Sequence, residues 1–435
     1  MINSLFSFMK MIPDPRSRRR KKHDQAEVLT CLIIALSTGQ NSLRECLSWL
    51  RGKESWLRAH TKMKLRGGIA SLPTVSRMLS RIDTVEFSLI IAEWTCELVG
   101  PAHRKAIAEG RMPHIAIDGK ALRGSGTHEK EHSRPPMVMN AYDAETGLVL
   151  TQLPIKDKGC ELKEMPNLMK IISMRGCMVT IDAAGTFDTI MDQITGSGAH
   201  FLLQVKDNQL LAKDEIIIEA IKGFDVDKKA REKCGSYDRY TSIERNRGRN
   251  EYREVKCCQD ESILEETRIK WPWVKTYGIS HQIRILHTKD DDGRDTTPSL
   301  GDFLRKGSWR QPKEDIDASG SDDKKSANQL IGLVSDVPLT AKEMAKIKRE
   351  HWAIENNYHH VMDDTFREDH SKATSSKDNL ALLRKIAYDI IQMITNGREK
   401  ESGSTFPEKR RWLACREKQL ISVIFEKTEP ARARF

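Results

Sequence analysis

The stretch that decides the fold is His114-Ile115-Ala116-Ile117-Asp118-Gly119-Lys120, together with a second stretch, Met178-Val179-Thr180-Ile181-Asp182-Ala183. In each, a short apolar run ends in an aspartate that is followed by a small residue. Such a run predicts a buried strand. A carboxylate at the end of a strand lies at the sheet edge where open α/β sheets bind ligands. Asp118 and Asp182 are therefore candidate site residues, although a single strand-terminal aspartate can also simply cap the next helix.

The segments around these two stretches predict a mixed α/β core. The expected order is three strands, a helix, a strand, a helix and a strand, at 115–117, 137–142, 148–154, 162–172, 178–181, 186–194 and 200–205. Residues 207–340 break this rhythm with short β-like runs among polar segments, and we interpret them as an insertion. Within the insertion, residues 290–325 are rich in Asp, Gly, Ser and Lys, a composition typical of a mobile loop.

The whole chain is expected to divide into an all-helical domain, two parts of the core, the insertion and a basic tail, at 1–105, 106–206 with 341–396, 207–340 and 397–435. In the helical domain, Pro73 suits the first turn of a helix. Arg77 and Arg81, four residues apart, share the face of that helix opposite its apolar residues. This helix could lie on DNA, or it could be an ordinary surface helix.

Composition points to a polyanion as partner and to the cytoplasm as location. The chain has 435 residues with a formal net charge of +10, and basic residues cluster at 16–22 and 409–434. Such clusters bind phosphates in a salt-dependent way, or form solvated tails. The longest apolar run, 28–36, is too short to span a bilayer, and the N-terminus lacks the pattern of a signal peptide. The odd number of cysteines, without a C-x-x-C pair, indicates a reducing compartment.

A third acidic residue, Glu355, lies in a long helical pattern downstream. Oxygen ligands suit Mg²⁺ or Mn²⁺, and two such ions about 3.5–4 Å apart can hold both reacting oxygens of a phosphodiester. Spacing alone does not select Glu355 over its acidic neighbours Asp363, Asp364, Glu368 and Asp369. The histidines at 351–370 offer a zinc site as an alternative, but neither an H-E-x-x-H motif nor a cysteine accompanies them.

Two further polar segments are candidate contacts to DNA. Lys206, Asn208 and Gln209 follow the last core strand directly and could hold phosphates, or form a polar turn. Arg249 belongs to a basic segment of the insertion that could contact DNA, or form a charged hairpin.

Taken together, a set of motifs in a fixed order resembles one known family. They are Ile12-Pro13-Asp14-Pro15-Arg16, Ala116-Ile117-Asp118-Gly119-Lys120 with Leu122-Arg123-Gly124-Ser125, Thr180-Ile181-Asp182-Ala183, Lys206-Asp207-Asn208-Gln209, His351-Trp352-Ala353-Ile354-Glu355-Asn356, Thr365-Phe366-Arg367-Glu368-Asp369 and Asn379-Leu380-Ala381-Leu382-Leu383-Arg384. Over residues 12–394 the chain resembles the DDE transposases of bacterial insertion sequences, in the group that includes the H-repeat-associated proteins of Rhs elements.

The resemblance implies an α/β fold: a ribonuclease-H-like mixed-sheet catalytic core with a β-rich insertion and an N-terminal all-helical, DNA-binding domain. It implies Asp118, Asp182 and Glu355 as the catalytic triad that holds two Mg²⁺ (or Mn²⁺) ions per active site. It implies DNA contacts by residues of the matching motifs, which add Lys120, Arg123 and His351 to the candidates above. The implied partners are double-stranded DNA, as terminal inverted repeats and as target, and a second copy of the chain, since joining two ends calls for at least a dimer. The implied location is the bacterial nucleoid.

The chain departs from the family pattern in three places. Asp207 stands where the family usually has glycine, Arg247 stands in a histidine position, and the loop at 290–325 is longer than expected. The activity implied is cleavage of element ends and their joining to target DNA by two-metal phosphoryl transfer. Two alternatives remain open: a metal-dependent nuclease that cleaves without joining, and a DNA-binding regulator derived from a transposase.

Overall fold

The computed structural model describes residues 3–17, 21–125, 135–155, 161–181, 188–205, 228–229, 232, 236–246, 249–259, 272–287, 292, 297, 326–427 and 429–431. The chain forms two compact units. The first comprises Met1–Val179, Ser197–Ala199 and Glu350–Phe435, and the second comprises Thr180–Gly196 and His200–Arg349. Residues from both ends of the chain therefore belong to one unit.

The first unit opens with five helices, α1 (Leu5–Met11), α2 (Gln25–Ser37), α3 (Leu43–His60), α4 (Leu72–Leu79) and α5 (Thr84–Ala108). Side chains cap the first turns of α2 and α3. Asp24 accepts from the amide of Glu27 at the start of α2, and Ser42 forms a reciprocal capping box with Glu45 at the start of α3. In α4 Val75, Met78 and Leu79 are buried, while Arg77 is exposed.

The strands of the first unit follow in the predicted order. The strands are β1 (His114–Ala121), β2 (Met137–Asp143), β3 (Val149–Ile155) and β4 (Met178–Ile181). A 3₁₀ turn, η1 (Arg123–Ser125), follows β1, and the helix α6 (Glu161–Ile171) precedes β4. β2 lies between β1 and β3 and is antiparallel to both, and β4 lies on the other side of β1. β4 crosses the boundary between the two units. Its apolar residues and those of β1 are buried, as the two opening stretches predict.

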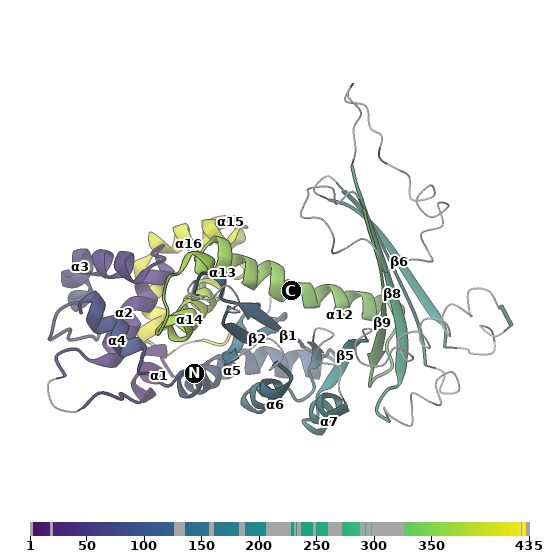
Figure 1. The fold of residues 1–435 in the computed structure, drawn as a ribbon, viewed down its shortest axis with the longest axis horizontal. Coiled ribbons are helices and arrows are strands. Elements are labelled where there is room, and N and C mark those ends of the chain that lie inside the picture. Colours follow the sequence, from purple (N-terminus) through teal and green to yellow (C-terminus); the bar gives the residue numbers. More distant parts are fainter. Residues whose placement is uncertain are drawn as a thin grey trace. The chain divides into compact units, whose positions relative to one another are not determined.

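The C-terminal third of the first unit is helical. It contains the end of α12 (Ala341–Ile354), a π-helix η5 (Glu355–His359), α13 (His360–Asp364), η6 (Glu368–His370), α14 (Lys377–Thr395), α15 (Glu399–Ser402), α16 (Phe406–Ala414) and α17 (Glu417–Phe425). Figure 1 shows the yellow C-terminal helices beside the purple N-terminal ones, and α14 contacts α2, α5 and β3. The segment expected as a basic tail thus contains three helices, and two of its cations, Lys409 and Arg410, are buried.

The second unit is rich in β-structure. It contains α7 (Asp188–Gly196), β5 (His200–Val205), β6 (Asp238–Asn246), β7 (Arg249–Cys258), β8 (Thr276–Leu286) and β9 (Ser326–Ser335). Its antiparallel strands lie in the order β5-β9-β8-β7-β6, and Figure 1 shows β9 beside β8. The strands of the insertion, 9 to 11 residues long, are longer than the short apolar runs of the sequence. They extend through polar residues because charges pair along and across them, as Arg253 does with Glu244 and Glu251.

The predicted fold class is confirmed. A mixed α/β core carries helices at the N-terminus and a β-rich insertion before the last helical segment. The loop predicted at 290–325 lies outside the described residues except for 292 and 297.

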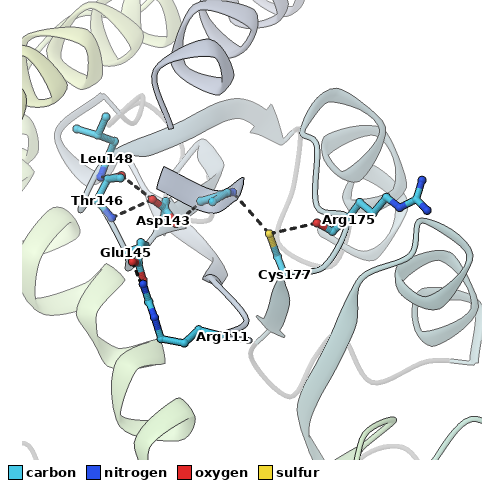
Figure 2. Close-up of polar contacts among 8 residues, drawn as sticks. Arg111, Asp143, Glu145, Thr146, Leu148, Arg175 and Cys177 are labelled. Atoms are coloured by element: carbon cyan, nitrogen blue, oxygen red, sulfur yellow. Dashed lines mark hydrogen bonds and ion pairs between the residues drawn. The ribbon is translucent and has the colours of Figure 1, made fainter. Parts of the chain in front are cut away.

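A buried polar cluster joins α5 to the sheet of the first unit. His103 on α5 lies 2.9 Å from an oxygen of Asp143 at the end of β2, and the thiol of Cys177 lies 3.6 Å from its other ring nitrogen. Asp143 also accepts from the amide and the hydroxyl of Thr146 (Figure 2). Burial opposes the charge on His103, but the hydrogen bond to Asp143 raises the pKa of the imidazole to about 10. A charged pair of His103 and Asp143 therefore connects α5 to the sheet of the first unit.

This cluster predicts a pH-dependent contribution to stability. The pKa of His103 rises from 6.5 in a model peptide to about 10 in the folded chain. The pair should therefore stabilise fully below pH 6.5 and lose its charge contribution as the pH rises toward 10. Replacing His103 with Leu should cost about 3–5 kcal/mol near neutrality, because it strands a buried carboxylate. Urea unfolding of both proteins should show this difference shrinking between pH 7 and pH 10, and a difference that does not change with pH would contradict the charged pair.

Candidate active site

Asp118 lies within β1, not at the strand end that the sequence predicts, because Gly119–Ala121 continue the pairing with β2. Its carboxylate is partly open to solvent. Its side chain is 27% exposed, although the apolar residues before it are fully buried. One carboxylate oxygen accepts from the amide of Gly119 at 2.9 Å. The other lies 3.5 Å from Nδ1 of His359, which comes from the π-helix η5. An accessible, oriented carboxylate of this kind can bind a cation.

Glu355 is the first residue of η5 and is exposed. The sequence predicts that the helix runs on beyond Glu355, and it does, as far as Asp364. Over Glu355–His359, however, it widens from an α-helix into a π-helix, which the sequence does not predict. π-Helical turns are rare and are often found at functional sites. Since Glu355 and His359 lie within one such turn, the contact of His359 with Asp118 brings Glu355 to the same region of the first unit.

The remaining predicted site residues stand in four different situations. Asp182, Lys206, Asn208 and Gln209 lie outside the described residues. Arg77, Arg81 and Arg123 are exposed. Arg249 is half-buried and pairs with Glu251 at 2.5 Å, in the second unit. His351 and Lys120 are buried.

Lys120 is the centre of a buried ion-pair network. Its ammonium lies 2.5 Å from a carboxylate oxygen of Asp363 and 3.0 Å from one of Glu368, and Arg384 approaches Glu368 at 3.7 Å. Burial disfavours the charged ammonium, but Glu368 and Asp363 more than compensate and raise the pKa of Lys120. This placement favours a structural role for Lys120 over the predicted contact with DNA.

A close backbone approach supports the same network. A Cβ atom on Gly124 would lie 2.1 Å from the carbonyl oxygen of Asp369, so only glycine fits where η1 meets η6. Arg367, just before η6, adopts a left-handed conformation with φ 51°. The acidic stretch after η5 is therefore folded tightly against the end of β1.

The donor set suits a hard divalent cation. Asp118 and Glu355 offer carboxylate oxygens at accessible positions, and Mg²⁺ and Mn²⁺ prefer such ligands. Within the described ranges, the histidines, cysteines and acidic residues form no group of three that could hold an ion. Asp182, the remaining predicted ligand, is not among those residues.

Two residues that contact Asp118 or its partner were not predicted to do so. The sequence offers His359 for a zinc site and places it on the same helical side as Glu355, and it places Asn140 in a strand. A signal exists in the sequence: Asn140 is a polar residue inside the apolar run Met137–Tyr142, and a buried polar residue calls for a specific partner. That partner, Nε2 of His359, lies 3.2 Å away, but nothing local in the sequence identifies it.

Comparison with protein families decides the identity. A model described as "Transposase DDE domain" matches residues 109–389, and one described as "DDE_Tnp_1-associated" matches residues 6–95. The chain belongs to the DDE transposase family. None of the helices in the described part of this transposase is both long and apolar enough to cross a membrane.

Relatives cover nearly the whole transposase. It is 27% identical to "Putative transposase YncI" of Escherichia coli O157:H7, over 90% of this chain and 88% of that protein. It is 23% identical to "H repeat-associated putative transposase YhhI" of Escherichia coli K12, over 97% of this chain and 98% of that one. A solved piggyBac transposase synaptic complex with hairpin DNA matches with a TM-score of 0.41 and 8% identity, over 97% of this chain and 77% of that one.

The buried network predicts a large loss of stability when Lys120 is replaced and almost none when its neighbour Arg123 is replaced. Lys120→Met should lower the free energy of unfolding by about 3–5 kcal/mol, because it leaves carboxylates without their buried partner. Arg123→Ala, at an exposed position, should change it by less than about 0.5 kcal/mol. Urea unfolding measures both values. A Lys120→Met protein as stable as the wild type, but with weakened DNA binding, would restore the original prediction of a DNA contact.

Proposed function

We propose that this transposase cleaves the ends of an insertion element and joins the freed 3′ ends to target DNA, with Asp118, Asp182 and Glu355 as its catalytic carboxylates. The observation that carries the proposal is the contact between β1 and the π-helix. His359 lies 3.5 Å from Asp118, and Glu355 opens the same turn with its side chain exposed. Asp182 is included because it ends the apolar stretch Met178–Ile181 in the sequence, as Asp118 ends Ile115–Ile117.

The three carboxylates would hold two Mg²⁺ or Mn²⁺ ions. When bound, the ions would activate the attacking oxygen and stabilise the leaving 3′ oxygen of the phosphodiester. The chain's own contribution is to hold its carboxylates in place. The Gly119 amide fixes one oxygen of Asp118, and the ion pairs of Lys120 neutralise Asp363 and Glu368. Those two acids therefore do not compete with the triad for cations.

Cations at exposed positions would hold the DNA. Arg77 and Arg81 lie at the solvent side of α4 and just after it, and Arg123 lies in η1, a few residues after Asp118. Phosphate contacts of this kind orient a duplex without reading its sequence. Lys206, Asn208 and Gln209 would add contacts close to the scissile strand, and Arg249 would add one from the insertion. Two copies of the chain would be needed to bring two element ends together in the bacterial cytoplasm.

The carboxylate triad is tested by neutral, nearly isosteric substitutions. Asp118→Asn, Asp182→Asn and Glu355→Gln should each reduce cleavage of a duplex that carries the element's terminal inverted repeat to background. Binding of the same duplex, measured by gel shift, should remain, because the exposed arginines are unchanged. Asp364→Asn serves as matched control, since this carboxylate is exposed and pairs with His360 rather than facing Asp118. Mg²⁺-dependent cleavage by any one of the three variants would remove that residue from the triad.

Joining is tested separately from cleavage. A duplex supplied with its 3′ end already cleaved should be inserted into a supercoiled plasmid by the wild-type protein and not by Glu355→Gln, because both steps use the same carboxylates. Gel analysis of the plasmid distinguishes the outcomes. A protein that cleaves intact ends but never joins the pre-cleaved ones is a nuclease, and one that binds ends and does neither is a regulator.

A further inference from the structure

A row of polar side chains crosses the sheet of the first unit beneath the π-helix. Asp118 on β1 stands directly opposite Asn140 on β2, and Asn140 stands opposite Gln152 on β3. Directly opposed residues project from the same face of a sheet. Asn140 and Gln152 are buried, at 0% and 4% exposed. Buried amides require specific hydrogen-bonding partners, so the row marks a place where a defined element must dock.

The element that docks there is the π-helix. The hydroxyl of Tyr358 donates to the Gln152 carbonyl oxygen at 3.0 Å. The next residue, His359, contacts both of the other members: its Nε2 lies 3.2 Å from the Asn140 amide nitrogen, and its Nδ1 lies 3.5 Å from Asp118. Two consecutive side chains of the turn that begins with Glu355 therefore contact all three residues of the row.

The surroundings of His359 select one tautomer. The side-chain nitrogen of Asn140 lies 3.2 Å from Nε2 and can only donate, so Nε2 must carry the lone pair. The Asn140 amide group donates to Nε2, which leaves the proton on Nδ1, facing the carboxylate. With the opposite tautomer, a ring lone pair would face an anionic oxygen. The Nδ1–H group is thus directed at Asp118.

We propose that His359 is a positioning residue for Asp118. Its neutral ring, held by Asn140, directs one N–H at Oδ2, while the Gly119 amide holds Oδ1. Both oxygens are thereby restrained, and the carboxylate meets a divalent cation in one orientation. Partners that orient metal ligands in this way typically contribute a factor of about 10–100 to metal affinity. The inference rests on the proposed function, in which Asp118 is a metal ligand.

The test measures binding of Mn²⁺ alone, without DNA, from the electron paramagnetic resonance signal of the free ion. His359→Leu removes the donor and should weaken binding about 10- to 100-fold. His359→Asn keeps an N–H close to the position of Nδ1 and should bind within a few-fold of the wild type. His360→Leu is the matched control. His360 is next in the sequence, but it is exposed and pairs with Asp364 instead of Asp118. Circular dichroism and the midpoint of thermal unfolding show whether each variant is folded.

Each result decides between specific alternatives. A folded His359→Leu protein with wild-type affinity overturns the positioning role, as does a folded His359→Asn protein that binds as weakly as Asp118→Asn. Electron spin echo modulation of the bound Mn²⁺ should show no directly coordinated nitrogen; a strong nitrogen coupling that is lost in His359→Leu would make His359 a ligand instead. If Asp118→Asn itself binds Mn²⁺ normally, the proposed function fails, whereas loss in Asp118→Asn without loss in His359→Leu refutes only the positioning role.

Discussion

The ammonium of Lys120 lies inside the first unit, and its charge is stable there because two carboxylates from a distant part of the sequence face it. Removing a charge from water costs several kcal/mol unless a partner compensates. β1 can therefore take its buried position only together with the segment that carries Asp363 and Glu368. The same contact commits these two acids to structure. Asp118, whose side chain is 27% exposed, and Glu355, which is exposed, stay accessible for chemistry.

Buried charges join the two ends of the chain in a similar way. Lys385 and Asp389 of α14 pair at 2.9 Å with both side chains fully buried; Lys385 also donates to Thr95 on α5, and Asp389 accepts from the amide of Val149 on β3. Arg410 of α16 donates to backbone carbonyl oxygens at the C-terminal end of α2. The C-terminal helices thus hold the N-terminal helices against the sheet, which is why one compact unit contains both ends.

Local patterns in the sequence predicted what depends on local physics. Apolar runs identified β1 and β4, and the aspartate that follows the first run identified Asp118 as a candidate, although β1 continues beyond it. The sequence did not reveal that Lys120 and Arg410 are buried. Their partners lie hundreds of residues away, and the residues next to them in the sequence do not show whether a cation is buried or solvated. Nor did it predict the π-helix, whose extra width is set by packing. Glu355 was selected over its acidic neighbours only by resemblance to a family motif.

Asn140 indicates that the polar row orients neighbouring side chains and does not serve mainly to stabilise the fold. Its side-chain carbonyl oxygen is buried and has no hydrogen-bond partner among the residues that the structure describes. A group in that state costs about 1–3 kcal/mol. An apolar residue at 140 would avoid the cost and would pack against the same strands. It would also leave Nε2 of His359 without a donor and the imidazole free to take either tautomer. The amide is therefore best understood as setting the direction of one N–H group, and through it the orientation of Asp118.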